Sequence, residues 1–157
     1  MPSVTMVSRL LDAADKLLEE GPRSSAFKRR AVSTAYYAVF HALAKACADS
    51  LLPSRDRHSE EYSRVYRALE HGSLKEAFAK GPLQDRENLR KIGDLVVLLQ
   101  SERHRADYLP PIKNGFSGRE AKKLVDQARQ AVAEINSLDL ADCLTLAACL
   151  LFRSRQQ

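Results

Sequence analysis

The amino-acid sequence predicts an all-α fold, an antiparallel helical bundle of about five or six helices. Apolar residues recur at intervals of three and four along most of the chain, the spacing that places them on one face of an α-helix. No segment shows the strict alternation of apolar and polar residues that is typical of a half-buried β-strand. Glycine and proline separate the helical patterns by short connections, which favours antiparallel packing of consecutive helices.

The first two helices are predicted over about residues 4–20 and 24–50. Gly21-Pro22 interrupts the apolar pattern of the first helix and ends it. The second helix is the longest and ends before Leu52-Pro53, because a proline disfavours helical backbone in the residue that precedes it.

A third and a fourth helix follow, and capping residues and prolines mark their ends. Ser59 is the expected N-cap of the third helix, and Gly72, directly after His71, is its expected end. The fourth helix keeps coiled-coil-like apolar spacing and fades near Tyr108, ahead of Pro110-Pro111. The apolar positions behind these predictions are Tyr62, Val65, Tyr66 and Leu69 in the third helix, and Leu89, Ile92, Val96, Leu99 and Ala106 in the fourth.

Two further helices are predicted after a linker at residues 110–116. Ser117-Gly118-Arg119-Glu120 has the S-x-x-E form of a capping box and is expected to begin the fifth helix. The final segment, about residues 138–152, is apolar around more of its circumference and should be buried, either in the bundle or against a partner chain. We therefore expect a helical bundle over residues 1–137 and a C-terminal helical extension over residues 138–157.

Composition indicates an ordinary globular chain. Of its 157 residues, 45% are apolar and 29% charged, and no run approaches the roughly 18 uninterrupted apolar residues of a membrane span. The first residues lack the basic region and continuous apolar core of a signal peptide, so we expect a cytoplasmic protein without membrane contact. The three cysteines include no C-x-x-C pair and are expected to be reduced.

Positive charge is concentrated at the start of the second helix. The formal net charge of +5 permits an anionic partner without requiring one. Arg23, Lys28, Arg29 and Arg30 form a run that contains no acidic residue, where the phosphate backbone of a nucleic acid could be attracted. The alternative is that this run is only the solvated start of a helix.

The second predicted helix carries two different faces. Arg30, Thr34, Tyr37 and His41 fall within about 60° of one another, and the opposite face is apolar. A histidine can move a proton between two oxygens of a reacting phosphate, and a neighbouring arginine can hold the anion. The alternative is a hydrogen-bonded histidine with a structural role. The apolar face consists of Val32, Ala35, Tyr36, Val39, Leu43 and Ala46.

Several motifs of known enzyme classes are absent from the sequence. It contains no glycine-rich phosphate loop, no H-E-x-x-H, no paired cysteine ligands and no G-x-S-x-G. The four histidines are too scattered to suggest a metal site, and nothing indicates a cofactor. We therefore expect neither a bound metal ion nor a cofactor.

Three segments resemble the signature of HEPN-domain proteins, particularly a small prokaryotic group. The A-Y-Y-A-x-F-H run of that group is matched by Ala35-Tyr36-Tyr37-Ala38-Val39-Phe40-His41. Its R-x-A-D-Y region and closing helix resemble Arg105-Ala106-Asp107-Tyr108, in which the arginine directly precedes Ala106, followed by Glu120-Ala121 and Leu124. Its middle segment resembles His71-Gly72-Ser73-Leu74 leading to Phe78. Together these matches cover about residues 8–137 in order.

This resemblance implies a HEPN-like bundle that forms a homodimer through the histidine-bearing helix. Many such relatives are metal-independent endoribonucleases of toxin-antitoxin or defence systems, with an arginine and a histidine on one helix face. Relatives of this shape commonly carry the arginine seven positions before the histidine, where this chain has Thr34. Threonine has no charge, so we expect RNA or nucleotide binding with endoribonuclease activity that is weakened or lost.

Two sets of residues follow from these observations. The candidate catalytic residues are His41, Thr34, Tyr37 and Arg103, and the candidate RNA-binding residues are Lys28, Arg29, Arg30 and Arg105. Arg103 lies on the apolar stripe of its helix and should have a partner or a ligand. For Arg105 the other expectation is a salt bridge to Asp107 or to another helix. Arg30 is about 16 Å from His41 along the helix axis.

A second hypothesis belongs to a different class. The same helices would form a non-enzymatic dimeric interaction module that binds a nucleotidyltransferase-like partner, such as an antitoxin. Thr34 favours this hypothesis, whereas His41 and the basic run at the start of its helix favour the ribonuclease-like one.

Overall fold

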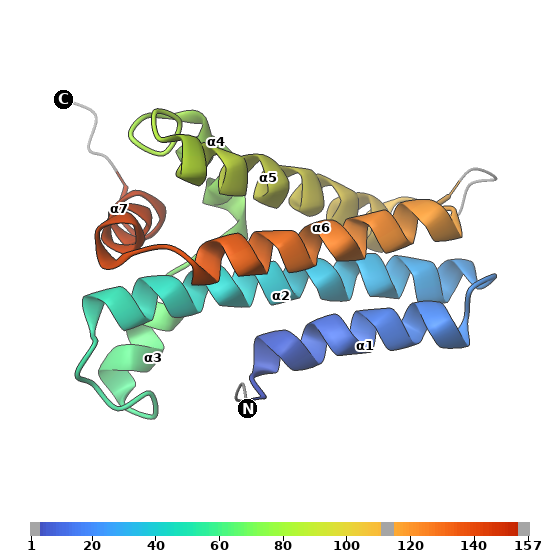
Figure 1. Ribbon diagram of the computed structural model, residues 1–157, viewed down its shortest axis with the longest axis horizontal. Helices are drawn as coiled ribbons and strands as arrows, with labels where there is room; N and C mark the ends of the chain where they lie inside the picture. Colours follow the sequence, from blue (N-terminus) through green and yellow to red (C-terminus); the bar gives the residue numbers. More distant parts are fainter. Residues whose placement is uncertain (1–3, 111–114, 154–157) are drawn as a thin grey trace. The chain divides into compact units, whose positions relative to one another are not determined.

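The computed structural model describes residues 4–110 and 115–153, and every regular element in them is a helix (Figure 1). The all-α prediction is therefore confirmed. The described elements are α1 (Met6–Glu20), α2 (Ser25–Leu51), α3 (Glu60–Arg67), the 3-10 turn η1 (His71–Ser73), α4 (Leu74–Ala79), α5 (Glu87–Tyr108), α6 (Gly118–Asn136) and α7 (Leu140–Leu151). Most of the predicted linker, residues 111–114, lies outside the described residues, as do residues 154–157 of the predicted extension. No helix in the described part is long and apolar enough to cross a membrane.

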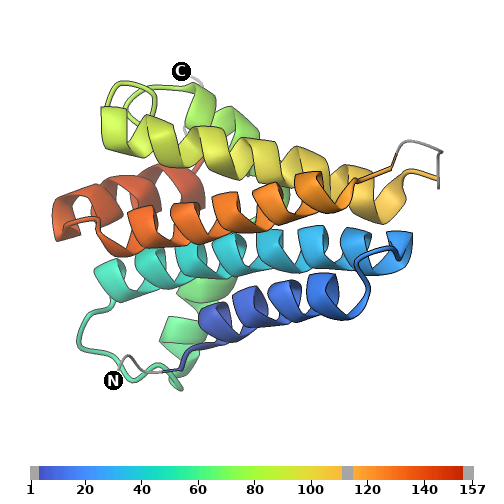
Figure 2. The ribbon, with the colours of Figure 1, turned by 45° about the vertical axis from the view of Figure 1, so that its right-hand side comes forward.

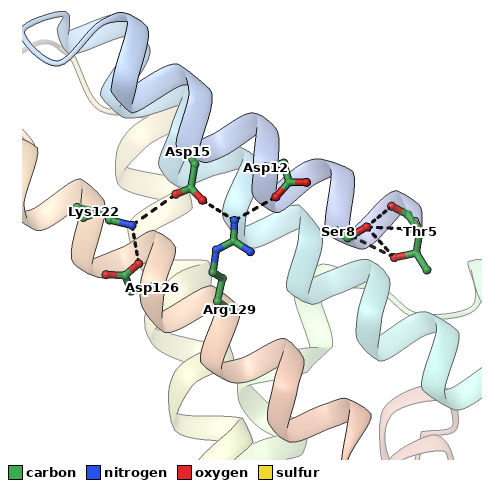
Figure 3. A network of polar contacts seen from close by, with 7 residues as sticks. All are labelled: Thr5, Ser8, Asp12, Asp15, Lys122, Asp126 and Arg129. Atoms are coloured by element: carbon green, nitrogen blue, oxygen red, sulfur yellow. Dashed lines mark hydrogen bonds and ion pairs between the residues drawn. The ribbon is translucent and has the colours of Figure 1, made fainter. Parts of the chain in front are cut away.

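Short side chains begin several of these helices. Ser59 accepts a hydrogen bond from the Tyr62 backbone at 3.2 Å, which confirms it as the N-cap of α3. Ser117 accepts one from the Glu120 backbone at 3.0 Å, which is one half of the expected capping box. At α1 a reciprocal box is complete. Thr5 and Ser8 each accept a hydrogen bond from the other's backbone N–H, at 3.1 Å and 3.0 Å (Figure 3).

The predicted end of the third helix is wrong. Helix α3 stops at Arg67, and Gly72 instead lies in η1, directly before α4. Helix α4 was not expected, because six residues are too few to show a helical period. Its Phe78 is buried against Gly93 of α5, where an added Cβ would lie 2.6 Å from the phenylalanine ring.

The chain divides into two compact units. One consists of Met1–His41 with Leu95–Ala133, and the other of Ala42–Asp94 with Glu134–Gln157. Helices α2, α5 and α6 each contribute residues to both units. The expected boundary at residue 137 stays a prediction.

In the first unit, α1 lies beside α2 and α6 (Figures 1 and 2). Arg129 of α6 forms ion pairs with Asp12 at 3.3 Å and with Asp15 of α1, and Lys122 lies 3.6 Å from Asp15 (Figure 3). Lys122 precedes Arg129, whereas Asp15 follows Asp12, so α1 and α6 run antiparallel. This agrees with the predicted arrangement of the bundle.

Helix α2 is buried around more of its circumference than predicted. The expected apolar face is confirmed over Val32, Tyr36 and Val39, but Ser33 and Ala38 outside that face are also almost completely buried. If α2 had a single core face, Ser33 and Ala38 would be exposed. The buried part of its circumference is therefore wider than the predicted apolar face. The stripe with Thr34, Tyr37 and His41 remains half-buried.

In the second unit, Asp49 of α2 binds three side chains. Its carboxylate accepts hydrogen bonds from Lys45 at 2.6 Å, from the Tyr62 hydroxyl at 2.7 Å and from Arg57 at 3.2 Å. Burial raises the pKa of Asp49, but these hydrogen bonds and positive charges lower it by more, so the net pKa lies below 3.8. Asp49 therefore attaches α3 and the preceding loop to α2.

The stabilising contribution of Asp49 should depend on pH. A carboxyl whose pKa is lowered by folding contributes stability above its unfolded pKa, and this contribution is lost as the pH falls through the folded pKa. We expect Asp49→Asn to lower the free energy of unfolding by about 1–2 kcal/mol at pH 7, and by much less at pH 3. Urea titrations at several pH values measure this difference. The control is Asp126→Asn, because Asp126 is a half-exposed carboxyl whose ion pair among the described residues is with Lys122; it should cost less than about 0.5 kcal/mol. A cost for Asp49→Asn that is equal at both pH values would contradict the assignment.

Helix α7 is buried on one face. Leu146, Ala147 and Leu150 are buried, whereas Leu140, Leu144 and Phe152 are exposed. Asp142 near its start accepts hydrogen bonds from Arg86 at 2.9 Å and Asn88 at 2.7 Å, and these connect α7 to the start of α5 and the turn before it. The expectation of a buried final helix is thus correct for one face, and the other face stays open.

Candidate functional site

The polar stripe on α2 runs along one side of the first unit. Arg30 is exposed, and Thr34, Tyr37 and His41 are half-buried. Tyr37 lies one helical turn before His41, and Thr34 lies about 10 Å before it along the axis. The stripe therefore presents hydroxyl groups and an imidazole that remain in contact with solvent.

Arg103 of α5 brings a positive charge to this part of α2. Its side chain is only 12% exposed. The guanidinium carbon lies 5.1 Å from the centre of the Tyr36 ring and 5.9 Å from the centres of the Tyr37 and Tyr108 rings. These are cation–π distances, and they stabilise a cation that has left most of its water. The predicted inward position of Arg103 is confirmed.

The polar partners of Arg103 do not satisfy it fully. Asp107 lies 3.8 Å from one guanidinium nitrogen, too far for a hydrogen bond, and Asp107 also accepts a hydrogen bond from Ser33 at 3.2 Å. Arg103 also hydrogen-bonds the Tyr36 hydroxyl. Its Nε is buried without a hydrogen-bond partner among the described residues. A buried N–H donor without a hydrogen-bond partner raises the free energy of the folded state. The site is therefore not optimised for stability alone.

Two titratable groups of this site have shifted pKa values. Burial raises the pKa of Tyr36 to about 12, although the nearby Arg103 charge acts in the opposite direction. Tyr36 therefore keeps its proton at neutral pH, and its hydroxyl oxygen accepts the hydrogen bond from Arg103. Burial lowers the pKa of His41 below 6.5, so its imidazole is neutral at pH 7 and can accept a proton.

Two of the four candidate RNA-binding residues are engaged in contacts within the first unit. Arg29 donates hydrogen bonds to the Leu109 and Pro110 carbonyls, where it caps the end of α5. Arg105 lies 3.5 Å from Glu120 of α6, with its guanidinium 4.0 Å from the centre of the Phe116 ring. The expected salt bridge from Arg105 to another helix is confirmed.

The remaining two candidates are placed differently. Arg30 is exposed and Lys28 is half-buried. Asp107, which was considered as a partner of Arg105, pairs with Arg103 instead, because residues four apart on a helix face the same side and residues two apart do not. The RNA-binding role of all four cations stays a prediction.

Sequence reasoning missed the contributions of Ser33 and Tyr108 to this site. The sequence identified Tyr108 only as part of a motif. The positions of Tyr37 and Tyr108 in the sequence do not show that both rings contact the Arg103 guanidinium. Within residues 4–110 and 115–153, no group of three or more His, Cys, Asp or Glu side chains is arranged to hold a metal ion.

The chain was compared with known proteins in three ways. It matches no protein-family model, no curated protein and no solved structure.

Proposed function

We propose that this protein binds RNA on the face of α2 that carries Thr34, Tyr37 and His41, and that it cleaves RNA slowly without a metal ion. It would then be a HEPN-like ribonuclease of prokaryotic toxin-antitoxin or defence type. The observation that carries the proposal is the position of Arg103, whose guanidinium lies over Tyr37, one turn from His41. A cation at the neighbouring helical turn and a neutral imidazole can supply the charge stabilisation and the proton transfer that phosphodiester cleavage uses.

The chemistry proceeds by transfer within the RNA. Neutral His41 takes the proton of a ribose 2′-hydroxyl, and the oxygen attacks the adjacent phosphorus. The bond from phosphorus to the 5′-oxygen breaks, and the imidazolium returns its proton to that oxygen, so the protein is unchanged. Arg103 would stabilise the charge on the phosphoryl oxygens. Its pairing with Asp107 and its burial weaken this effect, which accounts for a slow reaction.

Cleavage should survive removal of divalent ions, because the proposed chemistry uses only His41 and a cation. We expect equal rates with 5′-labelled single-stranded RNA in about 5 mM EDTA and in about 5 mM Mg²⁺, apart from a modest salt effect on binding. Separation of the products on a denaturing gel measures the rates. Loss of all cleavage in EDTA, with recovery on adding Mg²⁺, would contradict the mechanism.

We also propose that two copies pair through the same face of α2, as the HEPN resemblance implies. Tyr37 and His41 are half-buried and lie on the solvent side of α2, so a second copy related by a two-fold axis would bring two such stripes together. Light scattering at micromolar concentration should give twice the mass of the 17.6 kDa chain. A monomer at that concentration would contradict the pairing.

The second candidate function is a non-enzymatic module that binds a nucleotidyltransferase-like protein. Thr34 favours it, and so do the exposed apolar side chains of Leu140 and Leu144 on α7 and of Phe152 directly after it, which offer a contact surface. Under this alternative the protein neither binds nor cleaves RNA.

A further inference from the structure

The end of α5 exposes two aromatic rings that lie next to each other. Tyr108 is 66% exposed, and His104, also exposed, has its ring centre 5.0 Å from that of Tyr108 with 45° between the ring planes. Neither side chain belongs to the core. Exposed rings at this distance form a surface on which another flat aromatic group can stack.

Cationic side chains lie near these rings, with Asp107 as the acidic neighbour of Arg103. The Arg103 guanidinium carbon lies 5.9 Å from the centre of the Tyr108 ring. Arg29 binds the carbonyls of Leu109 and Pro110, so the start of α2, with Lys28 and Arg30, is held against the end of α5. The surface is thus complementary to a ligand that combines flat bases with a phosphate backbone.

The rings also connect directly to the candidate site on α2. Arg103 lies over Tyr37 and over Tyr108, so a single guanidinium joins the two. The hydrogen bond between Ser33 and Asp107 holds α2 and α5 together at the same level. A strand with a base on Tyr108 can therefore continue toward Tyr37 and His41.

We propose that Tyr108 and His104 form a stacking platform for the unpaired bases of single-stranded RNA, with Arg30 and Lys28 contacting its backbone. The inference rests on the proposed RNA-binding function and names its substrate class. Bases in a duplex are covered by their neighbours, whereas a single strand exposes the faces that rings of this kind bind. Because every base has such a face, the platform tolerates many sequences.

The test compares the affinities of two labelled RNAs for full-length protein, a 12-nucleotide single strand and a fully paired hairpin, by fluorescence anisotropy. We expect Tyr108→Ala to weaken binding of the single strand about tenfold or more, and Tyr108→Phe to keep it within about twofold. The matched control is Phe152→Ala, a ring that is 64% exposed in the second unit and should leave affinity unchanged. The hairpin should bind more weakly than the single strand.

Each result supports or overturns the inference. Wild-type affinity in Tyr108→Ala, or equal binding of hairpin and single strand, would overturn the platform while RNA binding itself stands. A wild-type protein that binds neither RNA would overturn both the platform and the proposed function. Thermal melting followed by circular dichroism checks that each variant is folded. Arg30→Gln should weaken binding and reduce its dependence on salt concentration, which distinguishes a backbone contact from stacking.

Discussion

Thr34→Arg is expected to raise the rate of RNA cleavage about a hundredfold over wild type. The substitution places a charged group on the same helix face as His41, at the position where relatives of the resembled family carry arginine. Thr34 is half-buried, so part of its side chain faces solvent. A hundredfold gain is the size expected for one electrostatic contact to a transition state.

Initial rates on labelled single-stranded RNA in EDTA measure the effect. Thr34→Gln is the matched control, since it lengthens the side chain without adding charge and should give no comparable gain. If Arg103 already supplies the full charge, wild type will be active, Thr34→Arg will gain little, and Arg103→Met will abolish cleavage. If neither wild type nor Thr34→Arg cleaves RNA while both are folded and dimeric, the ribonuclease proposal fails and the interaction module stands.

His41→Ala is expected to lower the rate of cleavage by about a hundredfold to ten-thousandfold, the usual contribution of a positioned general base and acid. His58→Ala is the control, because His58 is an exposed histidine in the loop before α3 and should leave the rate unchanged. Cleavage that persists in His41→Ala would place the site elsewhere.

The pH dependence of cleavage tests the same residue in the unaltered protein. Burial lowers the pKa of His41, and the reaction needs its neutral form to accept a proton. As the pH is lowered, the rate should therefore decline with a midpoint below pH 6.5. A decline with its midpoint above pH 7 would mean that another group, or a histidine with a raised pKa, limits the reaction.

Most helix positions could be predicted because their causes are local. The N-cap at Ser59 and the end of α5 at Tyr108 both depend on residues within a few positions in sequence. Helix α4 could not be predicted in this way. It exists because Leu74 and Phe78 are buried in the second unit, and Phe78 needs the space left by Gly93, which is distant in sequence.

The candidate site shows the same division. The apolar spacing of α5 predicts that Arg103 points inward, and the four-residue spacing to Asp107 could have predicted their pairing. Its position over Tyr36, Tyr37 and Tyr108 could not be predicted, because it depends on the register between α2 and α5.

By itself, the sequence determined the all-helical class, most helix ends and the polar stripe with Thr34, Tyr37 and His41, since periodicity and capping act over one or two turns. Only the tertiary structure decided which cation reaches that stripe, how much of α2 is buried and which rings stay exposed at Tyr108. These properties follow from contacts between helices far apart in the chain, and the free energy of such contacts depends on the whole set of packed neighbours rather than on any single segment.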